Sequence, residues 1–162
     1  MAYLNRGSSR GFTMVELILV MVIAGILAAV AVPRMIGRTS FDTRGFADQL
    51  SATVRFAQKL AIAQRRVVFT QLTANDLTLC YVATVPCPAA SWAPGPGGEK
   101  PFTISAPNGV AIASPLAVLA IDQGGRPQTA ALLDIPNRLD IQVNGTGTHQ
   151  VFVEQETGYV HD

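Results

Sequence analysis

The residue of this chain best placed for chemistry is a carboxylate in front of a long apolar run. Glu16 precedes residues 17–32, sixteen positions without a charged or strongly polar side chain. An ionisable group beside a membrane-embedded segment is costly, so it is a functional candidate by default. In surroundings of low dielectric constant it attracts a positive charge strongly, although desolvation offsets much of the gain. The pattern therefore predicts a functional role for Glu16.

The rest of the sequence contains no catalytic constellation. The two histidines, His149 and His161, have no cysteine or acidic pattern around them at metal-ligand spacing. No nucleophile motif or phosphate-binding glycine loop occurs. Asp122, Asp134 and Asp140 are scattered and are expected to cap turns. We therefore expect a protein that is not an enzyme and has no catalytic residues, no metal ion and no cofactor.

Composition narrows the class of protein further. Of the 162 residues, 49% are apolar and 14% are charged, whereas about 25% are charged in a typical soluble domain. Disorder is excluded because so much of the chain can bury apolar surface. The net charge of +1 argues against a nucleic-acid binder that relies on bulk charge.

The apolar run near the N-terminus admits three interpretations. Residues 12–32 are 21 residues long, and a helix of that length extends about 30 Å, enough to cross a hydrocarbon core. The run is a secretory signal peptide that ends at Ala31, a plain membrane anchor, or a helix kept after removal of a shorter leader. Two arginines precede it and two follow it, so flanking charge does not set its orientation.

The N-terminus resembles the prepilin-type segment of type IV pilins and type II secretion pseudopilins in the residues Arg10-Gly11-Phe12-Thr13-Met14-Val15-Glu16-Leu17. In that family a prepilin peptidase cuts after the glycine and methylates the new N-terminal residue. The resemblance implies cleavage between Gly11 and Phe12, N-methylation of Phe12, and removal of residues 1–11 as a leader peptide. It favours the third interpretation and implies a cytoplasmic N-terminus.

The resemblance also assigns roles within residues 12–33, which are expected to be a transmembrane and assembly helix in the bacterial inner membrane. In a helical filament Glu16 would meet the N-terminal amine of a neighbouring subunit, which exists only after cleavage; the alternative is an interfacial carboxylate that reaches water. Pro33 stands where many family members have a helix-kinking proline. The implied partners are the prepilin peptidase, other pilin or pseudopilin subunits and an inner-membrane assembly platform.

Residues 34–66 are expected to be an amphipathic helix. Its apolar stripe recurs at spacings of three and four and consists of Phe46, Leu50, Val54, Ala57 and Ala61. Arg55, Lys59 and Arg66 lie close together on the helical wheel. They form a solvated basic face, a contact with acidic neighbours in a filament or, as the third alternative, a DNA-binding face.

Residues 67–162 are expected to form a β-rich periplasmic head. A hairpin turn at residues 74–76 separates two β-branched runs at 67–73 and 77–85. Glycine-rich turns separate further short strands, expected at residues 102–105, 110–113, 116–121, 131–135, 139–143 and 150–153. The fold class is therefore α+β and pilin-like, with a long N-terminal helix packed on a C-terminal antiparallel sheet.

Three segments resemble, more loosely, the GspH/FimT group of minor pseudopilins: the helix-to-strand passage at 54–68, the turn at 121–127 and the closing segment at 157–160. Because the resemblance places the head in the periplasm, where disulfides persist, Cys80 and Cys87 are expected to form a structural disulfide. Two separate buried thiols are the alternative. A redox-active pair is not expected, because the spacing is not C-x-x-C.

Residues 86–101 hold five of the ten prolines, which predicts an exposed irregular loop. Trp92 within it either covers the core or anchors a partner. Charge is divided along the chain, because residues 1–75 hold nine basic and three acidic residues and residues 76–162 hold three and eight. This division favours contact between the head of one subunit and the stem of another.

The function that these features predict is structural. The chain is expected to be a minor pilin or pseudopilin that enters a type II secretion pseudopilus or a type IV pilus, including the mannose-sensitive haemagglutinin type. One alternative is a minor pilin for DNA uptake, although nucleic acid is not an expected partner because residues 154–162 are acidic. The other is a secreted periplasmic binding module whose signal peptide ends at Ala31.

Overall fold

The computed structural model describes residues 12–36 and 38–162, with side chains at 12–29 and 41–162. The predicted leader, with Gly11, lies outside the described residues. The chain divides into two compact units, Met1–Gly37 and Arg38–Asp162. The first is the start of the helical stem and the second is the head with its own helix.

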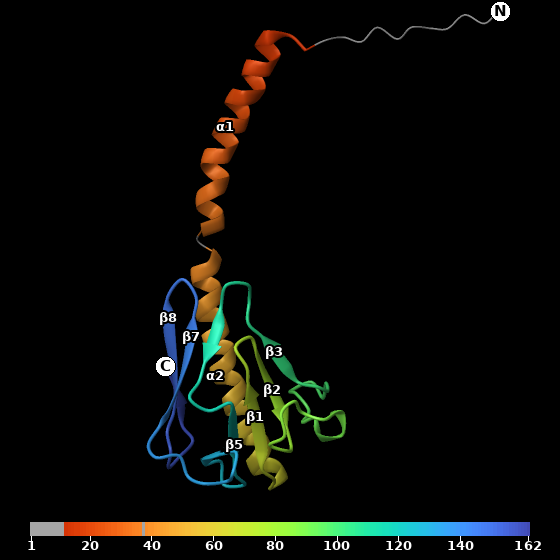
Figure 1. The fold of residues 1–162 in the computed structure, drawn as a ribbon, viewed down its shortest axis with the longest axis vertical. Coiled ribbons are helices and arrows are strands. Elements are labelled where there is room, and N and C mark those ends of the chain that lie inside the picture. Colours follow the sequence, from red (N-terminus) through yellow and green to blue (C-terminus); the bar gives the residue numbers. More distant parts are fainter. Residues whose placement is uncertain (1–11, 37) are drawn as a thin grey trace, which may run out of the picture. The chain divides into compact units, whose positions relative to one another are not determined.

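The first unit contains helix α1, Met14–Ile36 (Figure 1). Its described side chains are exposed on every side, and the large apolar ones between Phe12 and Leu27 are 49% to 84% exposed. A helix that is apolar all round is ordinarily covered by other protein or by lipid. Among the described residues, none of the helices has both the length and the apolarity that crossing a membrane requires. The helix continues past Pro33, and the kink expected at this proline stays a prediction.

The second unit begins with helix α2, Arg38–Gln64. The predicted apolar stripe is confirmed, since its five residues are at most 2% exposed. The helix ends two residues before the predicted boundary at Arg66. Arg65 adopts a left-handed φ of 47°, and the amides of Arg65 and Arg66 donate to the carbonyl oxygens of Ile62 and Ala61. This pair of bonds is a Schellman motif, which here ends a helix without glycine.

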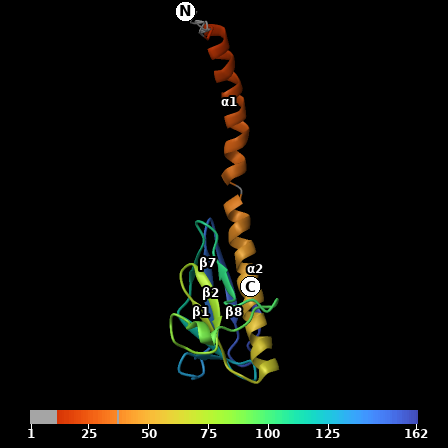
Figure 2. The ribbon, with the colours of Figure 1, turned by 90° about the vertical axis from the view of Figure 1, so that its right-hand side faces the viewer.

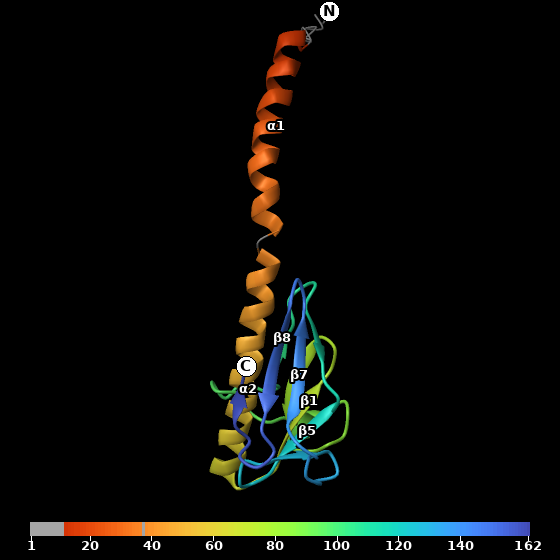
Figure 3. The same ribbon diagram turned by 90° about the vertical axis from the view of Figure 1, so that its left-hand side faces the viewer.

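Two antiparallel sheets pack against α2, where a single sheet was expected. Sheet A has the strand order β3-β2-β1-β5-β6, and sheet B has the order β4-β7-β8-β9. Figures 2 and 3 show α2 on one side of the head and the strands on the other. Strands β1, β5, β7, β8 and β9 all contact α2, so one helical face closes the core of both sheets.

Most predicted strands are present with shifted ends. The predicted hairpin is confirmed: β1 and β2 pair with Phe69 opposite Cys80 and Leu72 opposite Leu77. The bounds of the strands are β1 Val68–Leu72, β2 Asp76–Cys80, β3 Thr103–Ser105, β4 Ala111–Ala113, β5 Val118–Ile121, β6 Pro127–Thr129, β7 Leu139–Asn144, β8 Thr148–Val153 and β9 Val160–His161.

The strand predicted at residues 131–135 is wrong. The turn at 122–125 closes a hairpin directly, so β6 at Pro127–Thr129 becomes the partner of β5. The chain then reverses in a tight turn, in which Leu132 has a φ of 60° and its amide donates to the carbonyl oxygen of Thr129. The apolar residues at 131–133, which led to the strand prediction, belong to this turn.

Strand β2 stops at Cys80 because the chain there leaves the sheet and folds over its outer face. Residues that alternate with the α2-facing ones form a second, smaller apolar cluster, made of Phe69, Cys80, Val118 and Ala120. Val82, Ala83 and Cys87 cover this cluster. Residues 81–87 are therefore a cover on the sheet, not the continuation of the strand predicted at 77–85.

The side-chain amide of Gln58 on α2 binds two loops that lie close to each other. Gln58 Nε2 donates to the carbonyl oxygens of Gly125 and Thr157, at 3.0 Å each. Gly125 and Gly158 have φ values of 85° and 64°. A Cβ at Gly158 would overlap the carbonyl oxygen of Gly125. Glycine is required here both for its backbone conformation and for the space.

We predict that Gly158→Ala lowers the free energy of unfolding by about 2–4 kcal/mol, because strain at positive φ adds to the clash with Gly125. Gly98→Ala is the matched control for strain alone, since Gly98 has a φ of 86° with nothing within 4 Å, and should cost about 1 kcal/mol. Gly147, which also has open space, controls for the substitution itself. Urea denaturation measures all three, and equal losses for Gly158 and Gly98 would contradict the close approach.

The disulfide is expected to stabilise the head through the short loop that it closes. Replacing both Cys80 and Cys87 by alanine should lower the free energy of unfolding by about 2–3 kcal/mol. Reductant should have the same effect on the unaltered chain and none on the double variant, as followed by urea denaturation. An unchanged midpoint of the unaltered chain in reductant would reject this contribution.

Candidate processing and assembly site

The start of α1 is built by a side-chain cap that sequence inspection missed. Thr13 precedes the helix, and its Oγ1 accepts a hydrogen bond from the amide of Glu16 at 3.2 Å. The amide of Leu17 donates to the carbonyl oxygen of Thr13 at 3.2 Å. The signal was available, because a threonine followed three residues later by glutamate is the capping-box pattern. Thr13 therefore fixes where the helix begins relative to the predicted cleavage point.

Glu16 lies exposed in the first turn of α1. A carboxylate in this position is stabilised by the helix macrodipole, which is positive at the N-terminus. Within residues 12–36 and 38–162, no ion pair involves Glu16. Among the side chains that the structure describes, at 12–29 and 41–162, its carboxylate therefore has no cationic partner.

The predicted site residues fall on one short segment. Phe12 is the first described residue and is 76% exposed. It lies two residues before the start of α1 and four before Glu16, while Gly11 lies outside the described part. The apolar surface of α1 follows immediately. The structure therefore brings together the residue expected to become the new N-terminus, the carboxylate expected to meet such an N-terminus and the helix that carries both.

The disulfide between Cys80 and Cys87 is present, with an S–S distance of 2.00 Å. Cys80 belongs to the small apolar cluster on sheet A, and Cys87 belongs to the cover over it. Trp92, from the proline-rich loop, pairs through its backbone with Cys80 and is half-buried. The cysteines are therefore structural.

The predicted basic face of α2 is partly used within the chain. Arg55 donates from Nε and Nη2 to the carbonyl oxygen of Val160, at 3.2 and 3.0 Å. The guanidinium of Arg66 lies 3.7 Å from the ring centre of Tyr81, whose hydroxyl donates to Gln64. Lys59 is exposed. Two of the three cations thus hold other elements against α2.

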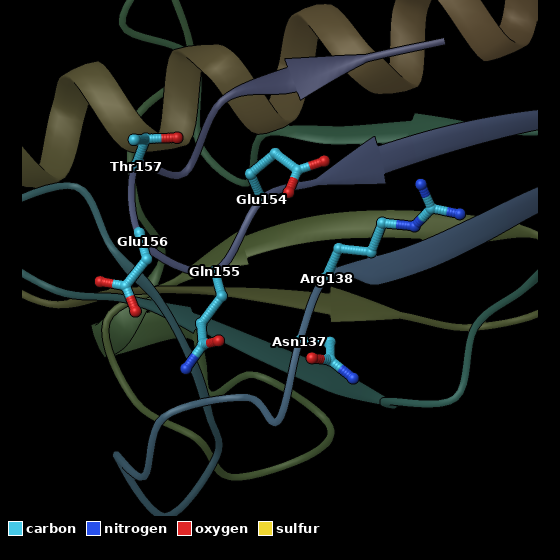
Figure 4. Close-up of a pocket in the computed structure, with 6 residues that line it drawn as sticks. All are labelled: Asn137, Arg138, Glu154, Gln155, Glu156 and Thr157. Carbon is cyan, nitrogen blue, oxygen red and sulfur yellow. The ribbon is translucent and has the colours of Figure 1, made fainter.

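A cavity of about 630 Å³ lies at the surface of the head, and its charged lining residues are paired (Figure 4). It is lined by Asn137, Arg138, Glu154, Gln155, Glu156 and Thr157. Each charged lining residue has a partner: Arg138 pairs with Asp140 at 2.9 Å, Glu156 with Arg126 and Glu154 with His161, both at 3.0 Å. In the described part of the chain, no group of three histidine, cysteine or acidic side chains could hold a metal ion.

Comparison with known proteins supports the N-terminal assignment. Residues 6–32 match the prokaryotic N-terminal methylation motif. The type IV narrow pilus major component PilA5 of Thermus thermophilus is 41% identical over 69 residues. That match covers 41% of this chain and 60% of the relative, so the chain spans less than two thirds of the length of this curated relative.

The head shares its fold with a solved minor pilin. Two crystal structures of the type IV minor pilin FimU from Pseudomonas aeruginosa superpose with TM-scores of 0.52 and 0.53, at 13% and 12% sequence identity. They cover 73% and 75% of this chain and 90% and 88% of FimU. At this identity the likeness concerns the fold. The methylation motif and the pilin relative thus match parts of the chain, and the FimU structures show a fold that the chain shares.

Proposed function

We propose that this chain is a structural subunit of a type IV pilus, made as a prepilin and incorporated into a helical filament through α1. The observation that carries the proposal is the arrangement at the start of α1. An exposed carboxylate follows the predicted mature N-terminus by four residues, on a capped helix whose apolar surface is exposed on all sides. Such a helix is suited to packing against copies of the same kind of helix.

Processing and assembly would follow from this arrangement. Cleavage after Gly11 would release the leader and expose the amine of Phe12, which would then be methylated. The apolar α1 would hold the subunit in the inner membrane, with the head in the periplasm, until the assembly platform draws it into the filament. There Glu16 would meet the amine of Phe12 from a neighbouring subunit, and removal from water would strengthen their attraction.

The pilus is favoured over the type II secretion pseudopilus by the relative PilA5, which is a type IV pilus component. The secreted binding module remains the competing function, because it would use the same apolar segment as a signal peptide. The position of the mature N-terminus separates the two.

We predict that the mature protein begins with N-methylated Phe12. Intact-mass and N-terminal peptide measurements on protein isolated from the native host's membranes should show loss of residues 1–11 and one added methyl group. Gly11→Val provides the control, because a branched side chain at the cleavage position should leave the full-length prepilin. A mature chain that begins at Val32 would refute pilin-type processing and support secretion.

We also predict that the charge of Glu16 is needed for assembly and not for processing. Glu16→Gln preserves the size of the side chain and its capping capacity while removing the charge, so it should be processed normally and be lost from sheared filaments. Thr13→Ala is the matched control for the helix start: it removes the cap, worth about 1 kcal/mol, and leaves the carboxylate. Normal incorporation of Glu16→Gln, measured by immunoblot of the filament fraction, would exclude the proposed pairing.

A further inference from the structure

Strands β2 and β3 are neighbours at one edge of sheet A (Figure 1). Beside residues 81–87, which cover part of the outer face, the side chains of these two strands on that face are polar. Thr78 lies directly opposite Thr103, and Asp76 lies opposite Ser105. The two threonine Oγ1 atoms are 2.9 Å apart, and Ser105 Oγ donates to Asp76 Oδ1 at 2.6 Å. The side chains that alternate with them on these strands face the core. One half of the outer face is therefore apolar and covered, and the other half is a row of paired polar groups.

A cavity of about 340 Å³ lies over this row. Asp76, Thr78 and Thr103 line it from the sheet, and the half-buried Trp92 and the exposed Pro101 line it from the proline-rich loop. Its volume is within the range of small-molecule sites, which are about 300–1,000 Å³ and combine apolar walls with a few placed polar groups. We call it the Trp92 cavity, defined by these five residues.

The wall of the Trp92 cavity beside the disulfide is held in place. Cys87 lines the cavity and is bonded to Cys80 on β2. Gln71 is 5% exposed, and its Nε2 donates to the carbonyl oxygens of Thr84 at 2.6 Å and Val82 at 3.4 Å. The loop that forms this wall is thus fastened to the sheet at two points, which leaves little ordering cost for a ligand.

The hydrogen-bonding groups of the Trp92 cavity offer a donor beside an acceptor. Two paired hydroxyls use one of their two hydrogens, so the Thr78–Thr103 pair has one O–H left to donate. Asp76 uses Oδ1 for Ser105 and has Oδ2 as a further acceptor. An adjacent donor and acceptor suit a ligand hydroxyl, which can both donate and accept.

Charge limits the class of ligand. Asp76 is the one charged residue that lines the Trp92 cavity, and lysine, arginine and histidine are absent from its lining among the described residues. Anionic ligands would meet repulsion without a compensating cation. Cationic ligands would find a single carboxylate, which already accepts from Ser105 at one oxygen, and no second acidic side chain in the lining. An uncharged ligand fits this lining best if it has an apolar face to lie on the indole of Trp92 and hydroxyl groups to bond to the polar side chains of the sheet.

We propose that the Trp92 cavity binds a sugar unit of a neutral oligosaccharide. The C–H face of the pyranose ring lies against Trp92, and its hydroxyls bond to Asp76 and to the Thr78–Thr103 pair. This binding site lies on the head and uses none of the residues assigned to processing or assembly. It gives the subunit a recognition function separate from its place in a filament.

Trp92 is the only tryptophan of the chain, so its fluorescence reports directly on the cavity. The full-length chain, purified in a detergent without a sugar headgroup, is titrated with maltohexaose, cellohexaose and chitohexaose. A saturable fluorescence change with any of them supports the proposal. A response to chitohexaose alone assigns the ligand to N-acetylhexosamine chains such as those of cell walls, and a response to the glucans assigns it to hexose polymers. Absence of a saturable change with all three, or a saturable change only with a proline-rich or lysine-rich peptide, overturns it.

Variants separate the cavity from the remainder of the head. Thr103→Val keeps the size and the strand preference of an exposed residue while removing a hydroxyl, and should weaken binding about fivefold. Trp92→Ala, followed by calorimetry, should weaken it at least about tenfold. Tyr159→Ala is the control, because Tyr159 is 64% exposed and lies outside the cavity lining. Should Trp92→Ala not fold, Thr103→Val decides: an affinity equal to that of the unaltered chain overturns the proposal.

Discussion

Burial of one face of α2 against two sheets is the interaction on which the head depends. Leu50, Val54 and Ala57 are at most 1% exposed and belong to the same cluster as residues from β1, β5, β7 and β8. Neither sheet has a second layer that could close its inner face within the described residues. The two sheets are therefore joined through α2, whose buried apolar side chains decrease in size from Phe46 to Ala61 along the stripe.

Around this stripe, side chains of α2 donate to backbone carbonyl oxygens of the loops, and two loop backbones approach each other closely. Gln58 holds two loops, Arg55 holds the last strand through Val160, and Gly158 admits the neighbouring backbone at Gly125. Such contacts are specific, because each donor bonds to the carbonyl oxygen of one particular residue. They place the C-terminal segment against α2 even though β9 is only two residues long.

Local patterns predicted those parts of the fold that local interactions decide. The stripe of α2 follows from the spacing of Phe46 and the apolar residues after it, and the β1–β2 hairpin follows from a turn between two β-branched runs. The division into two sheets depends on pairings distant in sequence, such as Val68 with Ile121, which no local pattern specifies. At the site, Glu16 and Phe12 were found from a motif, whereas the Trp92 cavity required knowing that residues 81–87 fold back over β1.

Several of the few charged side chains of this chain contact other groups within the head. Arg126, Arg138 and His161 are paired with carboxylates, and Arg55 and Arg66 contact other elements of the same head. Exposed ion pairs contribute little stability, about 0–1 kcal/mol each. These five side chains therefore have partners within the head, where they connect one element to another. Among the described residues, the large exposed apolar side chains are by contrast gathered mainly on α1.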